Sequence, residues 1–206
     1  MSRPELPDTL EPVTMLARHS DVVGARIAGL HGEVDAAFSH LAECVIVASV
    51  DRLDLGGATI VDTRAETFTA TEVIARDARW RTVEVSGGRI GTLDLLRAEL
   101  DVVTFCDVRI DYLSLSGARL RDVQFERCRI GTLDVPQAAF ERVSFEDCQV
   151  DEVDTRDLRA RDVDLRGLEA LSFTDPAGLR GTTLDDRQAQ LHAAAFATAL
   201  GISVTE

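Results

Sequence analysis

The chain has 206 residues, a net charge of −14 and an isoelectric point near 4.7. Phosphate groups would be repelled by this charge, so the composition argues against direct binding of nucleic acid or of an anionic membrane. No apolar run approaches the ~20 residues of a membrane span. The first twenty residues contain three prolines and three acids where a signal peptide is basic and apolar, and we expect a cytoplasmic protein.

The N-terminal quarter lacks a clean repeat. Residues 1–20 are polar and interrupted by proline, which predicts an irregular leader. Residues 21–50 contain fragments of a pattern, such as Ala25 with Ile27, whose phase slips relative to the later sequence. An end turn of a repeat protein is usually atypical because it covers the open end of the core.

Residues 51–170 repeat every five residues and, more informatively, every twenty. The third and fifth positions of each block are apolar or small, as in GTLDL, LRAEL, DVVTF and CDVRI. Leu93, Leu113 and Leu133 recur at intervals of twenty. Two apolar residues separated by one outward residue indicate a short strand, and the next two positions suit a bend. Four such sides predict one square coil, with parallel strands stacked ~4.8 Å apart.

These blocks resemble those of the pentapeptide-repeat proteins. The resemblance implies an all-β solenoid, a right-handed quadrilateral parallel β-helix, with a C-terminal capping α-helix. We expect the leader at 1–20, the repeat region at 21–171 with regular coils over 51–170, and a connector and helix at 172–206. Inward residues of the turn from Val61 to Trp80 balance large and small side chains, and Gly88 is predicted to leave room for the ring of Phe68.

Four cysteines fit a reducing compartment. Cys128 and Cys148 share one inward column a coil apart, where the spacing alone would permit a disulfide. Two small buried thiols are the other interpretation, and the sequence leaves both open.

The C-terminal segment predicts one amphipathic helix. Thr182 or Thr183 suits its N-cap, and Gly201 its end. Its apolar residues are expected to cover the last coil, to pair two copies of the chain, or both, because members of the resembled family commonly pair through their C-terminal ends. The apolar residues assigned to this cap or dimer surface are Leu184, Leu191, Ala195, Phe196 and Leu200.

Outward residues twenty apart form charged columns. One column contains acids interrupted by Ile74 and Ser114, and a second contains Arg89, Arg109 and Arg129. The acidic stripe assigned as a partner-binding surface consists of Asp54, Asp94, Asp111, Asp134, Asp151 and Asp154.

The family resemblance supplies a hypothesis for this stripe. Some pentapeptide-repeat proteins imitate duplex DNA in width and charge and bind type II topoisomerases. The stripe would then occupy the basic DNA-binding surface of DNA gyrase or topoisomerase IV. The alternative is a structural scaffold or binding module with another partner, the acids serving solubility.

No catalytic, metal or cofactor site is expected. The four histidines, His19, His31, His40 and His192, lie outside the regular coils, and no Ser-His-Asp arrangement is visible. The sequence therefore predicts a protein partner, no direct nucleic-acid or membrane binding, and a homodimer formed through the C-terminal end as an open possibility.

Overall fold

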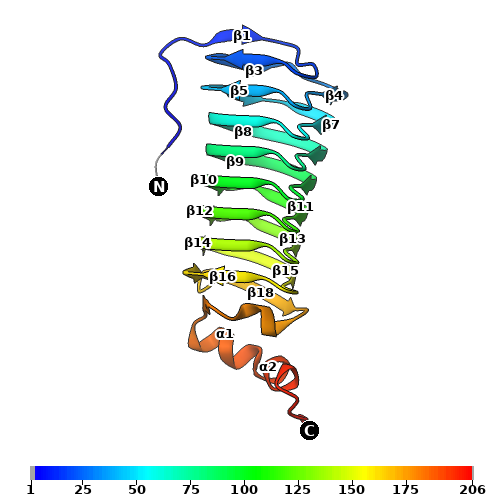
Figure 1. Ribbon diagram of the computed structural model, residues 1–206, viewed down its shortest axis with the longest axis vertical. Helices are drawn as coiled ribbons and strands as arrows, with labels where there is room; N and C mark the ends of the chain where they lie inside the picture. The colour runs from blue at the N-terminus through cyan, green and yellow to red at the C-terminus, as the bar shows by residue number, and fades with distance from the viewer. Residues whose placement is uncertain (1–2, 206) are drawn as a thin grey trace.

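The computed structural model describes residues 3–205 and shows a parallel β-solenoid with four-sided coils, as the repeats predict (Figure 1). Hydrogen bonds join its nineteen strands into one sheet. Leu113 pairs with Leu93 on one side and with Leu133 on the other, which confirms the period of twenty. Residues 1–2 of the predicted leader and residue 206 lie outside the described part of the chain.

The strands are β1 (Glu11–Val13), β2 (Asp21–Val23), β3 (Ala25–Ala28), β4 (Glu33–Asp35), β5 (His40–Ala42), β6 (Val45–Val47), β7 (Ser49–Asp54), β8 (Thr59–Ile74), β9 (Arg79–Asp94), β10 (Glu99–Cys106), β11 (Arg109–Ser114), β12 (Arg119–Glu126), β13 (Arg129–Asp134), β14 (Ala139–Glu146), β15 (Cys148–Asp154), β16 (Arg159–Arg161), β17 (Val163–Asp164), β18 (Leu168–Phe173) and β19 (Thr182–Thr183). The helical segments are the 3-10 turn η1 (Pro176–Leu179), α1 (Asp186–Leu191) and α2 (Ala193–Ala199).

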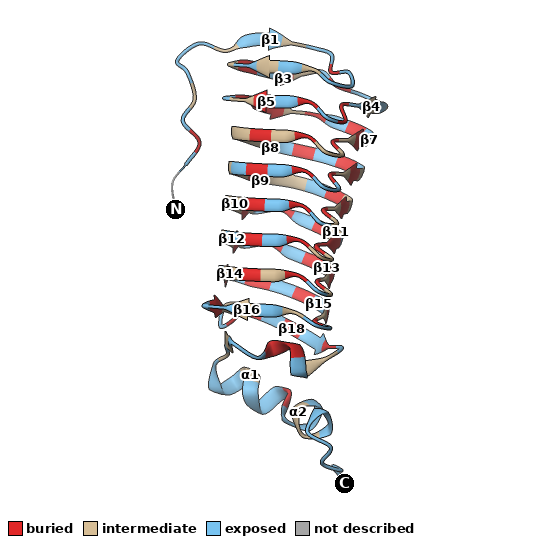
Figure 2. Ribbon diagram, viewed as in Figure 1, coloured by how far each residue is buried: buried red, intermediate tan, exposed pale blue. Residues whose placement is uncertain are grey.

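Buried and exposed residues alternate along the strands of the regular coils (Figure 2), and the buried side chains form one continuous core. Phe105, Phe125 and Phe145 stack one coil apart, with ring centroids 4.9 and 4.8 Å apart. Cavities found inside the coils measure only about 40 and 10 Å³. The core therefore has no lumen that a substrate could enter along the axis.

Gly88 is required for a different reason from the one predicted. It pairs with Phe68 in the preceding coil, and a Cβ placed on it would lie 2.0 Å from the carbonyl oxygen of Phe68. Its φ is +102°, which side chains of L residues rarely adopt. The glycine makes room for the backbone of Phe68 rather than for its ring.

The coils formed by residues 21–65 are one residue shorter than the regular coils that follow. His40 pairs with Thr59, nineteen residues later, whereas Ser49 pairs with Thr69 at the regular interval of twenty. This difference explains the phase slip in the sequence. The predicted leader is also partly ordered. Its strand β1 pairs with β3 and extends the solenoid to residues before 21.

The C-terminal segment differs from the single predicted helix. Thr182 and Thr183 form β19 and pair with β17, so part of the predicted connector completes the last coil. Asp185 is the N-cap of α1, and its side chain accepts a hydrogen bond from the Gln188 N–H at 2.7 Å. The helix is interrupted at His192, where ψ of 9° separates α1 from α2.

Candidate protein-binding surfaces

The predicted aspartate column exists in the register of the strands. Asp94 and Asp134 both pair with Ser114, and Asp134 pairs with Asp154 in the next coil. Asp54 joins the same column through Ile74. All four aspartates are half-buried, because each lies where a side ends and the chain bends.

These aspartates support the turns of the coils. The carboxylate of Asp54 accepts a hydrogen bond from the Gly56 N–H at 2.8 Å, and that of Asp94 accepts one from the Leu96 N–H at 3.0 Å. Asp154 binds the N–H two residues later in the same way, at 3.1 Å. This Asx-turn geometry explains why aspartate recurs at the position without reference to a partner. The sequence signal is an Asp two residues before a bend, repeated every twenty residues.

Asp134 has a different environment in the same column. The residue two positions later is Pro136, which has no N–H to donate. The carboxylate instead accepts a hydrogen bond from the Tyr112 hydroxyl at 3.2 Å. Loss of water around Asp134 raises the pKa of its carboxyl above the ordinary value, although the Tyr112 bond acts in the opposite direction.

Arginines neutralise several members of the predicted stripe. Asp94 lies 2.6 Å from Nε of Arg76, and Asp154 lies 2.5 Å from Arg156. The hydrogen bond from Arg156 is the main reason that the pKa of Asp154 is lowered.

The predicted arginine column contributes to the same effect. Arg89 pairs in register with Arg109, which pairs with Arg129. Arg89 and Arg109 contact Asp111 at 2.8 and 3.2 Å, and these hydrogen bonds, chiefly the one from Arg89, lower the pKa of Asp111. Asp151 is exposed and forms no ion pair within the described residues.

The acidic charge is unevenly distributed along the rod. Residues 63–133 contain eleven arginines and eleven carboxylates, and each of these carboxylates forms an ion pair. Residues 1–62 contain four arginines and ten carboxylates. Residues 134–206 contain seven arginines and fifteen carboxylates. The central coils are therefore neutral, and the excess acid lies toward the two ends.

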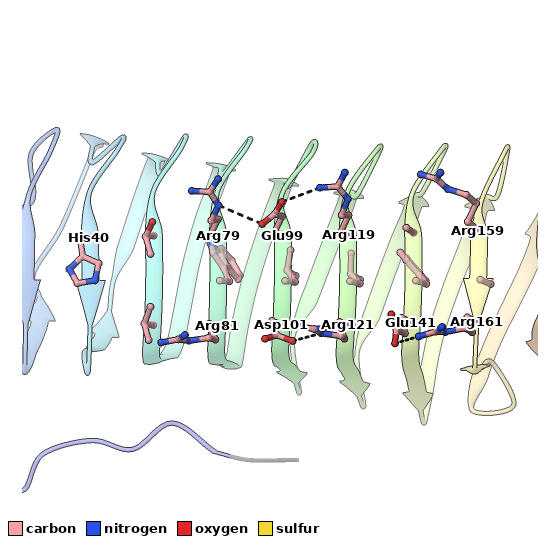
Figure 3. A pocket seen from close by; sticks show the side chains of 18 residues that line it. His40, Arg79, Arg81, Glu99, Asp101, Arg119, Arg121, Glu141, Arg159 and Arg161 are labelled. Carbon is pink, nitrogen blue, oxygen red and sulfur yellow. Dashed lines mark hydrogen bonds and ion pairs between the residues drawn. The ribbon is translucent and has the colours of Figure 1, made fainter.

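An arginine-rich face, which was not predicted from the sequence, lies on another side of the coil. Three pairs of outward arginines lie on β9, β12 and β16, two coils apart, with carboxylates on the coils between them. Figure 3 shows these side chains in two rows along an open groove of about 1040 Å³. The arginine face consists of Arg79, Arg81, Glu99, Asp101, Arg119, Arg121, Glu141, Arg159 and Arg161. Its signal in the sequence is an Arg-x-Arg spacing repeated forty residues later.

The C-terminal residues assigned to a cap or a dimer divide into two groups. Leu184 and Phe196 pack against the core, but Leu191 and Leu200 are 65% and 78% exposed, and Ala195 is exposed as well. Exposed Leu171, Ile202 and Val204 add to this apolar end of the molecule.

His192 anchors the cap, a role that the sequence did not reveal. The side chain is only 7% exposed, and its ring meets the edge of Phe173 at a centroid distance of 4.9 Å.

The cysteines are free thiols in this structure. Cys44, Cys128 and Cys148 are buried, and the Cys128 N–H contacts Sγ of Cys148 at 3.4 Å. Cys106 is partly exposed beside Asp107, and burial together with that carboxylate raises the pKa of its thiol to about 11. A thiol protonated at neutral pH is a poor nucleophile, so Cys106 has no feature of a reactive cysteine.

Within residues 3–205, no group of three or more His, Cys, Asp or Glu side chains is arranged to hold a metal ion. None of the helices in the described chain is long and apolar enough to cross a bilayer.

Comparison with known proteins identifies the repeat. Residues 78–155 match the family model described as a pentapeptide repeat region. No curated protein sequence matches the chain significantly.

Solved structures similar to this chain include HetL, a pentapeptide repeat protein involved in heterocyst differentiation regulation from the cyanobacterium Nostoc sp. strain PCC 7120. The identity is 14%, over 89% of this chain and 92% of that chain, with a TM-score of 0.41. Two trypsin-treated variants of QnrB1, a plasmid-mediated fluoroquinolone resistance protein, are each 13% identical. They cover 96% and 94% of this chain and 100% of those chains, with TM-scores of 0.29 and 0.27. The family match shows that residues 78–155 are a pentapeptide repeat region, and the same four-sided coils continue in the structure on both sides of it.

Proposed function

We propose that this chain is a non-catalytic rod that binds a basic surface of a protein partner through the carboxylates of its C-terminal third. The excess of fifteen carboxylates over seven arginines in residues 134–206 is the observation that carries the proposal. Asp151 and Glu152 are exposed beside Asp134, and none of the three forms an ion pair within the described residues. Carboxylates without arginine neighbours remain available to a cationic partner.

Type II topoisomerases are the first partners to test, with DNA gyrase and topoisomerase IV as the specific candidates. These enzymes bind duplex DNA on a basic surface that an acidic rod can occupy in its place. Asp94, Asp111 and Asp154 contribute less than the sequence predicts, because their charges are already balanced by arginines. Asp134 and Asp151 become the main members of the stripe, and Asp54 lies toward the other end of the rod.

A homodimer through the C-terminal end would strengthen this surface. Leu191 and Leu200 are exposed at that end, and exposed apolar side chains in a cluster favour association. Pairing of two copies there would place both carboxylate-rich thirds side by side at the centre of a longer rod. Leu191→Glu with Leu200→Glu is then expected to give a monomer in light scattering, where the unaltered protein gives a dimer.

The test is a supercoiling assay of gyrase titrated with the purified protein, with and without a quinolone. The variant Asp134→Asn, Asp151→Asn, Glu152→Gln is expected to lose at least tenfold in potency. The matched variant Glu33→Gln, Glu43→Gln, Asp51→Asn removes the same charge from the N-terminal end, and we expect it to retain its potency. An equal loss of potency in both variants would show that the effect on gyrase depends on the net charge of the protein and not on the C-terminal carboxylates.

A scaffold with another partner is the second candidate. The neutral central coils favour it, because a DNA imitation requires carboxylates along the length of the rod. No effect of the protein on gyrase or topoisomerase IV at tens of micromolar would leave the scaffold as the better explanation. A search for bound proteins with the acid-depleted variant as the control would then follow.

A further inference from the structure

The arginine face stands out against the net charge of the protein. Its outward strand positions contain six arginines and three carboxylates, in a chain whose net charge is −14. If the charges of this face served only solubility, we would expect carboxylates to outnumber arginines there, as they do in the whole chain. The positive excess is therefore a feature that solubility does not explain.

Two of these arginines have no internal partner. Arg119 and Arg121 pair with Glu99 and Asp101 at 3.1 and 3.0 Å. Arg81 and Arg159 are exposed and form no ion pair within residues 3–205. Arg159 follows Ala139 in its column, where the register provides no carboxylate. One unpaired guanidinium thus lies near each end of the groove.

The spacing of the arginine pairs matches one peptide conformation. The pairs lie on alternate coils, so their separation along the rod is ~9.6 Å, twice the strand spacing. A polyproline II helix has three residues per turn and a rise of ~3.1 Å per residue, so every third side chain recurs on one side after ~9.3 Å. Acids at every third residue would meet successive arginine pairs.

The carboxylates between the pairs favour a peptide over a nucleic acid. Glu99, Asp101 and Glu141 lie on the intervening coils. A peptide with two uncharged residues between acids passes over these carboxylates without repulsion. A nucleic acid carries a charge on every phosphate and would place some of them against the carboxylates.

We propose that the arginine face binds an extended acidic segment of a protein partner in the polyproline II conformation, with Asp or Glu at every third residue. The groove from Arg79 to Arg159 spans four coils, ~19 Å, which accommodates acids at positions 1, 4 and 7 of the segment. Arg81 and Arg159 anchor the first and last acids. The arginine face follows the stack of β9, β10, β12, β14 and β16, whereas Asp134 and Asp151 lie on β13 and β15 on another side of the coil, and its test requires no topoisomerase.

The probe is a fluorescein-labelled nonapeptide of three Asp-Pro-Pro units, followed by fluorescence anisotropy. Its control has the same composition, with three Asp residues followed by six prolines, so that charge and proline content are matched and only the spacing of the acids differs. We expect the spaced peptide to bind at least fivefold more tightly than the control, and added salt to weaken it. Equal affinity for the two peptides would overturn the proposed spacing.

Charge reversal on the rod locates the site. The double variant Arg81→Glu, Arg159→Glu is expected to bind the spaced peptide at least tenfold more weakly than the unaltered protein. Arg26 and Arg129 are also exposed and without an ion pair in the described chain, but they lie on other faces. Arg26→Glu with Arg129→Glu makes the same change in charge and is expected to alter affinity less than twofold. Circular dichroism checks that both variants keep the fold.

Two results would overturn the proposal. Equal weakening by both double variants would mean that binding depends on overall charge. Tighter binding of an oligothymidylate than of the spaced peptide at the same salt concentration would assign the face to nucleic acid.

Discussion

The ring of Phe125 lies against that of Phe105 at a centroid distance of 4.9 Å, with the two planes only 5° from parallel. Both side chains are completely buried, and Phe145 continues the stack on the other side of Phe125. The stack fills the centre of three successive coils. Phe125 packs against a ring in the coil on each side of it. We therefore expect its replacement to destabilise the fold most.

Phe125→Ala is expected to lower the free energy of unfolding by about 3–5 kcal/mol, through lost burial and the cavity that remains. Urea denaturation followed by circular dichroism measures the change. Phe38→Ala is the control, because Phe38 is 52% exposed, and we expect its cost to stay below about 1 kcal/mol. Equal costs at the two positions would contradict a filled aromatic core.

Alanine substitutions at Gly88 and Gly29 allow the cost of a steric clash to be distinguished from the cost of backbone strain. Both have positive φ, +102° and +81°, but a Cβ on Gly29 meets nothing within 4 Å, whereas one on Gly88 would lie 2.0 Å from a backbone oxygen. Gly29→Ala is expected to cost about 1–2 kcal/mol from the left-handed conformation alone. Gly88→Ala is expected to cost more than about 4 kcal/mol or to prevent folding, because two neighbouring coils must move apart. Thermal melts of the two variants measure the difference, and a milder effect at Gly88 would refute the close approach.

The regular coils were predictable from sequence because every twenty-residue interval repeats the same chemistry. Leu93, Leu113 and Leu133 illustrate this, and their register follows from counting. The register of the coils before residue 50 could not be predicted, because intervals of nineteen residues in place of twenty change the phase of the repeat.

The surface was less predictable than the core. The position of Asp94 follows from the repeat, but its pairing with Arg76 joins residues eighteen apart and depends on where two side chains point. The helix break at His192 was missed because the alanine-rich sequence around it favours a continuous helix. Burial of the imidazole against Phe173 overrides that local preference.

Asp154 and Asp134 occupy one column but are expected to respond oppositely to pH. The pKa of Asp154 lies below the ordinary 3.8, chiefly because Arg156 donates hydrogen bonds to it. Its charged form therefore stabilises the fold above pH 3.8, and this contribution is lost as the pH falls through the lowered pKa. Asp154→Asn is expected to be less stable than the unaltered protein at pH 7, by less than about 1 kcal/mol. The difference should disappear in acid.

The pKa of Asp134 is raised, chiefly by loss of water, so the sign reverses. Its protonated form stabilises the fold at low pH, and this stability is lost as the pH rises through the raised pKa. Asp134→Asn, which keeps an acceptor for Tyr112, is expected to be more stable than the unaltered protein at pH 7 and equal to it below pH 3.8. Urea midpoints between pH 3 and 7 test both variants, and shifts of the same sign at pH 7 would show that the column has one uniform environment.

His192 holds the C-terminal cap on the last coil through its contact with Phe173. The imidazole is 7% exposed and lies between Phe173 and Phe196, whereas neighbouring Leu191 is 65% exposed. His192→Ala removes the buried ring and is expected to release α1 and α2 from the coil without unfolding the solenoid, because these helices of six and seven residues are too short to persist alone. Hydrogen exchange is expected to rise at least tenfold in residues 186–199 and to stay unchanged in β10 to β14. Gln190→Ala, at an exposed position of the same helix, is the control and should leave both regions unchanged. Faster exchange throughout the solenoid of the His192→Ala variant would instead show that the cap is essential to the whole fold.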